Sequence, residues 1–364
     1  MNLFSQLTGM YGVKIMNPME IATMDTTGPT KEEEEAFAAM EARDINHQMA
    51  HAPAYPNPIV IYHGNCADGF SAAWVFWHVQ KIIPMTFDFH AGVYGEDPPD
   101  VSDRDVYLVD FSYPRQVVKD MIQIGGASHV TVIDHHKTAM ENLAGLDVEL
   151  AEDAAIAKME LDGVPLEEYQ DKLELIFDME RSGATMAWDY WSEVWEANHL
   201  NRPTLLGHVE DRDLWRFKLP LTREIQAAVF SYEYTFENWD RLMLETNTLV
   251  LAEGGMAIER KHHKDIAELV KVCQRMMNIG GYDVPVASLP YTLTSDAGHL
   301  MAKLHMDGKS FAACYWDTAD HRIFSLRSVE GGMDVSAVAK IYGGGGHKHA
   351  AGFKVLRSED LAMA

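Results

Sequence analysis

Short apolar runs rich in β-branched residues alternate with helical stretches from Pro58 to about residue 136. The runs read PIVIYH, PMTFDFH, VYLVDF and HVTVIDHH, and the helical stretches are Ala67 to Ile82 and PRQVVKDMIQI. This alternation is typical of a parallel sheet covered by helices on both faces, in which ligands collect beyond the carboxyl ends of the strands. The sequence therefore predicts an α/β fold with a ligand site at that edge of the sheet.

Four polar clusters follow apolar runs, where such a site would lie. They are His63, Cys66 and Asp68 in YHGNCADGF; Asp110 at the end of VYLVD; Asp134, His135 and His136 at the end of VTVIDHH; and Asp211 with Asp213 after TLLGHV. Taken singly, each residue is explained as a helix cap, a turn former or a polar strand end. Three polar side chains at the end of a buried strand would need buried partners, so the set together favours a metal site.

The ligand types indicate which metal to expect. Imidazole together with carboxylate suits Mn²⁺ and similar first-row ions, whereas an all-oxygen set would favour Mg²⁺ or Ca²⁺. We expect two Mn²⁺ ions, with Mg²⁺ or another divalent ion as the alternative. Two ions roughly 3.5–4 Å apart convert a bridging water into a hydroxide nucleophile and stabilise phosphoryl oxygens.

Changes in composition divide the whole chain into four segments. We expect an acidic extension over 1–57, an α/β domain over 58–238, a helical connector over 239–279 and a smaller mixed α/β domain over 280–364. Within the second segment, the stretch 150–200 is expected to be helical throughout. The last segment shows strand-like runs, one helix and a closing glycine-rich sequence, GGGGHKHAAGF.

The glycine-rich sequence and a nearby strand end are candidates for binding an anion. Consecutive glycines let backbone N–H groups approach a phosphate closely, and His347 beside them can donate to it. A guanidinium such as that of Arg327, which precedes Ser328, suits bidentate phosphate contact. A flexible loop and a surface salt bridge are the structural alternatives.

The motifs, taken in order, resemble a known family. HGNCADG, VYLVDFS, VIDHH and VEDRDLW are similar to the four motifs of the DHH phosphoesterases. That family includes RecJ-type exonucleases, oligoribonucleases acting on nano-RNA, cyclic-dinucleotide phosphodiesterases and, more distantly, manganese pyrophosphatases. GGGGHKHAAGF is similar to the glycine-rich motif of the DHH-associated C-terminal domain, so the resemblance extends over about residues 58 to 355.

The resemblance implies a role for each matching residue. Asp110 would bridge both metal ions, His135 would bind one of them with Asp68 and Asp211, and His63 would bind the other, with Cys66 as a further metal ligand. His136, together with Asp134, would act at the scissile phosphate. The substrate-binding residues would be Arg327, Ser328, Gly344, Gly345, Gly346 and His347.

One residue departs from the family pattern. The first motif usually supplies two aspartates one residue apart, and here Cys66 stands in place of the first, with His63 one residue closer than expected. Cys66 is either a soft ligand that shifts the metal preference or a replacement that leaves the first metal weakly held. The sequence leaves both open.

The resemblance implies metal-dependent hydrolysis of phosphodiesters in short oligonucleotides, single-strand ends or small nucleotides. The alternatives are a nucleotide or nucleic-acid binding module with weakened catalysis and a pyrophosphatase-like hydrolase. The net charge of −25 argues against a broad basic face for long duplexes, so a short single-stranded nucleic acid or a nucleotide is the expected partner. RNA or DNA preference, linear or cyclic substrates, cleavage polarity and oligomeric state, including a homodimer, stay open.

Composition also sets expectations about location. No apolar run approaches the roughly 20 residues that cross a bilayer, and the first residues lack the pattern of a signal peptide. Three widely spaced cysteines favour reduced thiols over a disulfide framework. We therefore expect a cytoplasmic protein without a membrane partner.

Overall fold

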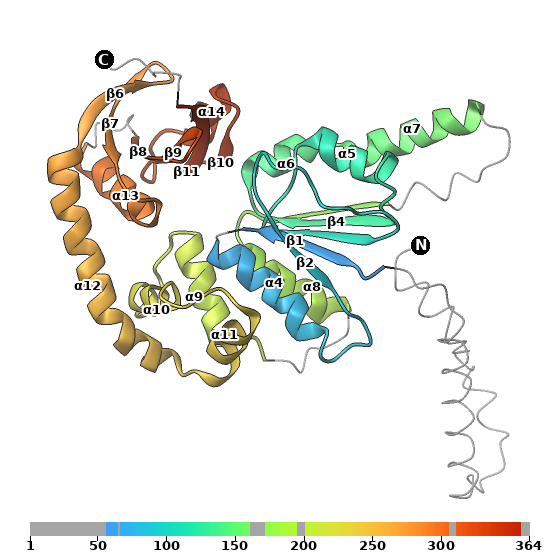
Figure 1. The fold of residues 1–364 in the computed structure, drawn as a ribbon, viewed down its shortest axis with the longest axis horizontal. Helices are drawn as coiled ribbons and strands as arrows, with labels where there is room; N and C mark the ends of the chain where they lie inside the picture. Colours follow the sequence, from blue (N-terminus) through green and yellow to red (C-terminus); the bar gives the residue numbers. More distant parts are fainter. Residues whose placement is uncertain (1–55, 65, 161–171, 195–200, 306–310, 358–364) are drawn as a thin grey trace, which may run out of the picture.

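The computed structural model describes residues 56–64, 66–160, 172–194, 201–305 and 311–357. Nearly all of the extension expected over 1–57 lies outside these ranges. The described residues form two lobes, each built around one sheet, and a long helix joins them (Figure 1). The expected fold class, a parallel-sheet domain followed by a smaller mixed α/β part, is confirmed.

The sheet of the first lobe is entirely parallel and has the order β2-β1-β3-β4-β5. Its strands are β1 (Ile59–His63), β2 (Asp88–Gly92), β3 (Asp105–Val109), β4 (His129–Asp134) and β5 (Leu173–Phe177). The strand order reverses between β1 and β3, and a crevice forms outside the carboxyl ends of strands at such a point. The polar residues that follow β1, β3 and β4 therefore meet at one edge.

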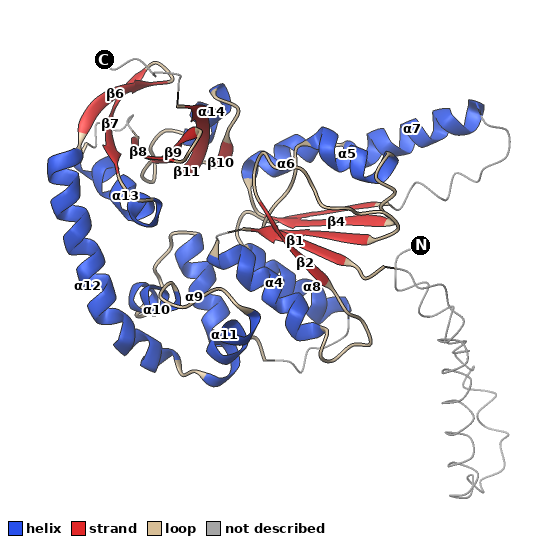
Figure 2. Cartoon of the chain, viewed as in Figure 1, coloured by secondary structure: helices blue, strands red, loops and turns tan. Residues whose placement is uncertain are grey.

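Helices cover both faces of this sheet (Figure 2). The helices of the first lobe are α4 (Ala67–Val79), α5 (Arg115–Gln123), α6 (Lys137–Leu143), α7 (Leu146–Glu160), α8 (Gly183–Val194), α9 (Thr204–Asp213), α10 (Thr222–Val229) and α11 (Phe236–Asp240). α4 is apolar on nearly every side and is buried between the sheet, α8 and α11, as expected of a helix without a polar face. α5, α6 and α7 cover the opposite face.

Two sequence expectations are corrected in this lobe. The stretch 150–200 is not helical throughout, because LELIF forms β5, which pairs in parallel with β4. The apolar stretch TLLGHV, which precedes the fourth polar cluster, does not form a strand but begins helix α9. Both segments are short apolar runs, and periodicity alone does not separate a strand from a buried helix at that length.

The second lobe is built on a six-stranded mixed sheet with the order β10-β11-β9-β8-β7-β6, in which only β7 and β8 are parallel neighbours. Its strands are β6 (Arg275–Ile279), β7 (Tyr282–Ser288), β8 (Ala312–Asp317), β9 (His321–Arg327), β10 (Gly345–His347) and β11 (Ala350–Leu356). α13 (Thr294–Leu304) packs on one face and α14 (Val335–Ile341) on the other, each over its own apolar cluster.

The connector between the lobes is α12 (Thr248–Cys273). It crosses α10 closely at Gly255, where a β-carbon would lie 1.7 Å from the Glu224 carbonyl oxygen. Its other end packs against α13 through Ile266 and Val270. The connector is therefore held by both lobes, and this fixes how they face each other.

Polar contacts also join the lobes directly, beside the end of β4. The backbone N–H of Gly346 in β10 donates to Thr138 Oγ1 in α6 at 3.1 Å. Lys137 Nζ lies 2.5 Å from Asp334 Oδ2, and Lys340 forms an ion pair with Glu141. The lobes thus meet across the first residues of α6.

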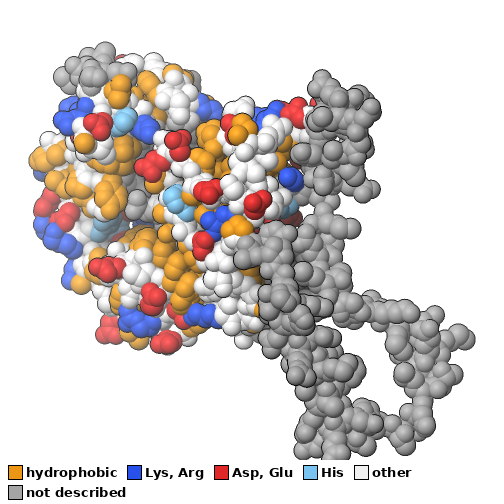
Figure 3. Space-filling view, turned by 45° about the vertical axis from the view of Figure 1, so that its right-hand side comes forward, with side chains coloured by type: hydrophobic (Ala, Val, Ile, Leu, Met, Phe, Trp, Pro, Cys, Tyr) orange, Lys and Arg blue, Asp and Glu red, His pale blue; other side chains and the backbone are white. Residues whose placement is uncertain are grey.

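Two further properties bear on the class of partner. Among the described helices, none combines the length and the apolar character that crossing a bilayer requires. On the face shown in Figure 3, acidic and basic side chains of the described residues are interspersed, with no continuous basic surface. A phosphate-binding region on this face would therefore have to be local.

Candidate metal centre

The loop between β1 and α4 carries the first three side chains of the site. His63 is the last residue of β1, Cys66 immediately precedes α4, and Asp68 lies in its first turn. The chain turns tightly here: a β-carbon on Gly69 would lie 2.5 Å from the His63 carbonyl oxygen. Glycine at this position therefore allows α4 to begin directly over the end of β1.

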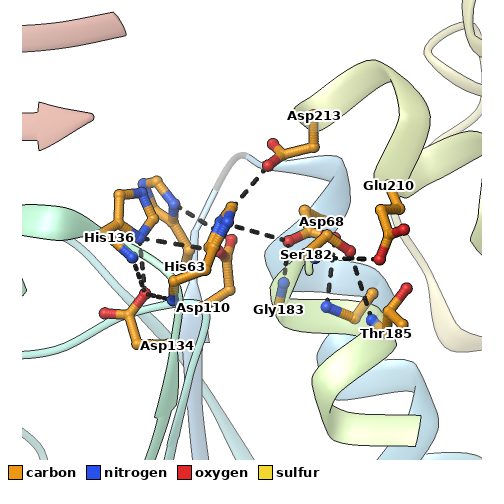
Figure 4. Close-up of polar contacts among 12 residues, drawn as sticks. His63, Asp68, Asp110, Asp134, His136, Ser182, Gly183, Thr185, Glu210 and Asp213 are labelled. Atoms are coloured by element: carbon orange, nitrogen blue, oxygen red, sulfur yellow. Dashed lines mark hydrogen bonds and ion pairs between the residues drawn. The ribbon is translucent and has the colours of Figure 1, made fainter. Parts of the chain in front are cut away.

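Asp110 follows β3 and lies at the centre of the cluster (Figure 4). Its backbone has a positive φ of 53° and donates its N–H to the Ile133 carbonyl oxygen of the neighbouring strand. The residue is 1% exposed, yet neither carboxylate oxygen accepts a hydrogen bond from the described residues. Oδ1 lies 3.0 Å from His135 Nε2, and Oδ2 lies 3.5 Å from His63 Nδ1. The two oxygens thus face two different groups of side chains.

Asp68 is fixed by the beginning of α8. Its two carboxylate oxygens accept the backbone N–H groups of Gly183 at 2.6 Å and Ala184 at 3.2 Å. Those N–H groups have no partner within their own helix, so the carboxylate caps it. Asp68 Oδ2 also lies 3.8 Å from His135 Nε2, so the cap holds the carboxylate at the cluster.

The side chains of His135 and His136, which follow β4, have different surroundings. Asp134 Oδ1 accepts the backbone N–H groups of His135 and His136 and lies 2.7 Å from His136 Nδ1. This arrangement fixes the His136 ring and leaves its Nε2 for another contact. His135 is 1% exposed and lies with Nε2 among the carboxylates of Asp110, Asp68 and Asp213.

The fourth cluster contributes Asp213, not Asp211, to this group. Asp213 Oδ2 lies 3.4 Å from His135 Nε2. Asp211 instead accepts the N–H groups of Lys218 and Leu219 and the hydroxyl of Thr222, at 2.7–3.0 Å. Residues two apart on a helix point roughly 200° apart, so only one of the pair can face the site. On a strand, both would have pointed the same way.

The side chains form four overlapping groups of donor atoms, and two of these contain His136, either with His135 and His347 or with Asp110 and Asp134. The other two groups share no residue. His63, Cys66 and Asp110 offer one set and Asp68, His135 and Asp213 another, with the atoms of each set within 4.8 Å of one another. The buried oxygens of Asp110 and the buried Nδ1 of His63 have no hydrogen-bond partner among the described residues. Buried polar atoms are normally paired, so these residues fit a divalent cation in each set.

The electrostatics of the cluster point the same way. Burial, followed by the charges of Asp110 and Asp213, raises the pKa of Asp68 well above its usual range. Burial opposes protonation of His135, but the carboxylates of Asp110, Asp213 and Asp68 raise its pKa to about 10. Burial would raise the pKa of Asp110, but the imidazoles of His135 and His63 lower it far below its usual range. Crowded buried carboxylates of this kind are stabilised by bound cations.

A cavity of about 1260 Å³ opens from the centre between the two lobes. Cys66, Asp68 and Asp213 line it from the first lobe, and His347 and Arg327 line it from the second. The ring of His347 stacks on that of His136, with centroids 4.4 Å apart. Burial, followed by the charge of His136, lowers the pKa of His347 well below its usual value, so the ring is neutral near pH 7.

The glycine-rich sequence does not present its N–H groups as expected. Gly344 lies against β11 and Gly345 against Thr138, where β-carbons would lie 2.1 Å from the Gly352 carbonyl oxygen and 2.9 Å from the Thr138 hydroxyl. The N–H of Gly346 is donated to that hydroxyl. The glycines thus allow the lobes to approach each other, and the cavity lining begins at His347.

The side chains of Arg327 and Ser328 lie in different surroundings: Arg327 lines the cavity, and Ser328 is buried. Arg327 lines the cavity and donates from Nη2 to Ser295 Oγ at 2.7 Å; burial lowers its pKa to about 10, which leaves it charged at pH 7. Ser328 is 1% exposed, donates to the Met333 carbonyl oxygen and lies 2.8 Å from His349 Nδ1. Ser328 therefore supports His349, which lines the cavity.

Further cavity residues had no signal in the sequence analysis. Trp215 stacks on His299 of the second lobe, with ring centroids 3.9 Å apart, and the Arg212 guanidinium lies 4.3 Å from the Trp215 ring centroid. Arg212 also bonds Asp296 of the second lobe at 3.2 Å. The two pairs that join the lobes, Trp215 with His299 and Arg212 with Asp296, are each 84 residues apart in sequence, and only the docking of the lobes brings them together.

No protein-family model matches the chain. An uncharacterized protein of Acanthamoeba polyphaga mimivirus is 26% identical over 314 residues, which span 81% of this chain and 66% of that protein. The chain thus spans just under two thirds of the length of that relative.

Solved structures similar to the chain include a RecJ protein and a phosphodiesterase. RecJ from Thermus thermophilus in complex with Mn²⁺ is 13% identical, with a TM-score of 0.43, over 85% of this chain and 51% of RecJ. The pGpG-specific phosphodiesterase PggH from Vibrio cholerae is 13% identical, with a TM-score of 0.38, over 83% of this chain and 94% of that one. These TM-scores lie below 0.5, so the function proposed below rests on the geometry of this chain.

Proposed function

We propose that the chain is a metal-dependent phosphodiesterase that hydrolyses short single-stranded nucleic acids or small nucleotides at the centre formed by Asp110. The observation that carries the proposal is the position of Asp110, whose two buried oxygens accept no hydrogen bond from the described residues and face two separate donor sets. A carboxylate in that position is suited to bridging two cations.

Each set of residues has a role in holding the ions. Asp110 would contact both, His63 and Cys66 would complete one site, and Asp68, His135 and Asp213 would complete the other. Mn²⁺ is the first choice for a mixed imidazole and carboxylate set, with Mg²⁺ as the alternative. The bound ions would supply an activated water and positive charge at the phosphoryl oxygens.

Other residues would act on the substrate directly. His136 is held at Nδ1 by Asp134, which leaves Nε2 to donate to a phosphate oxygen. Arg327 would pair with a phosphate bidentately. His347, neutral at pH 7, would orient the substrate without adding charge beside the ions.

The cavity supports a nucleotide as substrate. It is lined by aromatic side chains, among them Phe230, Tyr232 and Tyr234, together with arginines from both lobes. Aromatic rings provide stacking surfaces for bases, and arginines bind phosphates. A cavity of about 1260 Å³ between two lobes accommodates a dinucleotide or a chain end, but not a duplex wrapped on a broad surface.

The test is hydrolysis of a dinucleotide, a short single-stranded oligonucleotide and a cyclic dinucleotide with Mn²⁺ or Mg²⁺. We expect release of nucleotides by the wild-type protein, a loss of about a thousandfold or more in Asp110→Asn, and no change in Asp147→Asn, which alters an exposed carboxylate in α7. Tight binding of these ligands without turnover at saturating metal would instead indicate a nucleotide-binding module. Equal activity in wild type and Asp110→Asn would exclude this centre.

A further inference from the structure

Cys66 offers a sulfur donor atom at a centre whose other candidate ligands are nitrogen and oxygen atoms. Its sulfur lies within 4.8 Å of a ring nitrogen of His63 and a carboxylate oxygen of Asp110. The other set, Asp68, His135 and Asp213, contains only oxygen and nitrogen donors. The two sets therefore differ in chemical softness although they lie side by side.

The thiol has no evident structural duty. Cys66 is the residue that precedes α4, but its side chain makes no capping hydrogen bond to the helix. It lines the cavity and is partly exposed. The neighbouring Nδ1 of His63 and the oxygens of Asp110 are buried and make no hydrogen bond with the described residues, although Nδ1 lies 3.5 Å from Asp110 Oδ2. The sulfur and these atoms converge on the same space.

The donor set matches a particular kind of metal site. Thiolate and imidazole ligands select zinc and related ions, whereas carboxylate-rich sets suit Mn²⁺ and Mg²⁺. Catalytic zinc sites have three protein ligands and one open position, with neighbouring donor atoms roughly 3.3–3.8 Å apart when the bonds are about 2.0–2.3 Å long. A set already within 4.8 Å needs only small side-chain movements to close on such an ion.

We propose that Cys66 is a thiolate ligand that makes the centre heterobinuclear, with a thiophilic ion, Zn²⁺ foremost, at His63, Cys66 and Asp110, and Mn²⁺ or Mg²⁺ at Asp68, His135 and Asp213. The inference rests on the proposed function, because it concerns the same centre. On binding, the thiol gives its proton to solvent, and no oxidant or reductant takes part.

The experiment uses the full chain, stripped of metal, with Co²⁺ as a spectroscopic probe for the zinc site. We expect a sulfur-to-cobalt charge-transfer band in the near ultraviolet for the wild-type protein. The band should be absent in Cys66→Ser and Cys66→Asp and unchanged in Cys273→Ser, which alters a partly buried cysteine at the end of α12. Replacing even an outer-shell partner of a ligand typically lowers metal affinity roughly 10–100-fold, so Cys66→Ser should lower Zn²⁺ affinity at least tenfold.

A second measurement needs no variant at Cys66 and therefore does not depend on how such a variant folds. Alkylation of the wild-type protein, followed by peptide mapping, should show that Zn²⁺ protects Cys66 but not Cys273. Mn²⁺ alone should leave Cys66 reactive. The absence of both the cobalt band and the protection by Zn²⁺ would overturn the inference.

The outcomes separate this inference from the proposed function. Hydrolysis with Mn²⁺ by a protein that shows neither band nor protection leaves the phosphodiesterase standing and removes the thiolate site. A protein that shows both signals but hydrolyses none of the three substrates keeps the thiolate site and removes the proposed function.

Discussion

The backbone of Gly183 lies directly behind the side chain of Asp110. A β-carbon on Gly183 would come within 2.5 Å of the Asp110 β-carbon and 3.1 Å of its carboxyl carbon. The same residue donates its N–H to Asp68. One glycine at the start of α8 thus sets the position of two carboxylates that belong to different strand ends.

We therefore expect Gly183→Ala to displace Asp110 and to lower kcat and metal affinity, on the order of 10–100-fold, as for loss of a supporting contact at a metal ligand. Titration calorimetry with Mn²⁺ and steady-state kinetics measure the effect. Gly254→Ala is the matched control, because a β-carbon there, within α12, meets nothing within 4 Å. That control should keep full activity and raise the free energy of unfolding by about 1 kcal/mol. Equal activity in the two variants would contradict the role of Gly183.

Substitutions of Asp213 and Asp211 should have different effects, one on activity and the other on stability. Asp213→Ala should abolish metal-dependent activity and leave the free energy of unfolding nearly unchanged. Asp211→Ala should destabilise the protein by about 3 kcal/mol, because three donors lose their acceptor and each buried unsatisfied donor costs about 1–3 kcal/mol. Urea unfolding and activity assays on both variants provide the comparison. Loss of activity in Asp211→Ala and loss of stability in Asp213→Ala would instead indicate that Asp211 is the metal ligand.

Thr138 links the lobes through the N–H of Gly346, and its removal should weaken the closed arrangement. Thr138→Val keeps the shape of the side chain but leaves this N–H unpaired. We expect KM for a dinucleotide to rise about three- to tenfold, equivalent to roughly 1 kcal/mol for one lost hydrogen bond. Thr138→Ser restores the hydroxyl and should restore KM. If the valine and serine variants behave alike, the hydroxyl does not contribute.

His299 should make stability depend on pH. Its burial, together with the charge of Arg327, lowers its pKa to about 4 from an ordinary value of 6.5. Between these values the unfolded chain binds a proton that the folded protein does not, so the free energy of unfolding falls as pH is lowered from about 6.5 to 4. The full contribution is about 3 kcal/mol.

Urea unfolding at pH 7 and at pH 4 measures this contribution. His299→Phe keeps an aromatic ring on Trp215 and should lose less stability between the two pH values than the wild type. His263→Asn alters a half-exposed histidine of α12 and should follow the wild type. Parallel losses in all three proteins would show that His299 does not carry the effect.

The sheet and most of the centre could be predicted because strand ends are visible in sequence. Apolar runs of alternating β-branched residues mark β1, β3 and β4, and the carboxyl ends of parallel strands meet at one edge. Asp110 and His135 lie next to such ends, so their meeting follows from the pattern. The charged surroundings of LELIF hid β5, which is partly buried at the edge of the sheet.

The remainder depends on structure that the pattern does not encode. Choosing between Asp211 and Asp213 requires knowing that α9 is a helix and how it is rotated. The glycine run from Gly343 to Gly346 is compatible with an anion loop or with close packing, and the contact with Thr138 decides between them. Contacts across the lobes, such as Arg212 with Asp296, arise from docking and have no local signature.

The contacts that begin at α6 also bear on the rate of the proposed reaction. Lys137, Thr138 and Glu141 all bind the second lobe within a few residues of His136. Separation of the two lobes would break these contacts. In enzymes built in this way, separation of the lobes often limits turnover instead of bond cleavage. The maximal rate should therefore fall as solvent viscosity rises, because the lobes open more slowly than the chemical step proceeds.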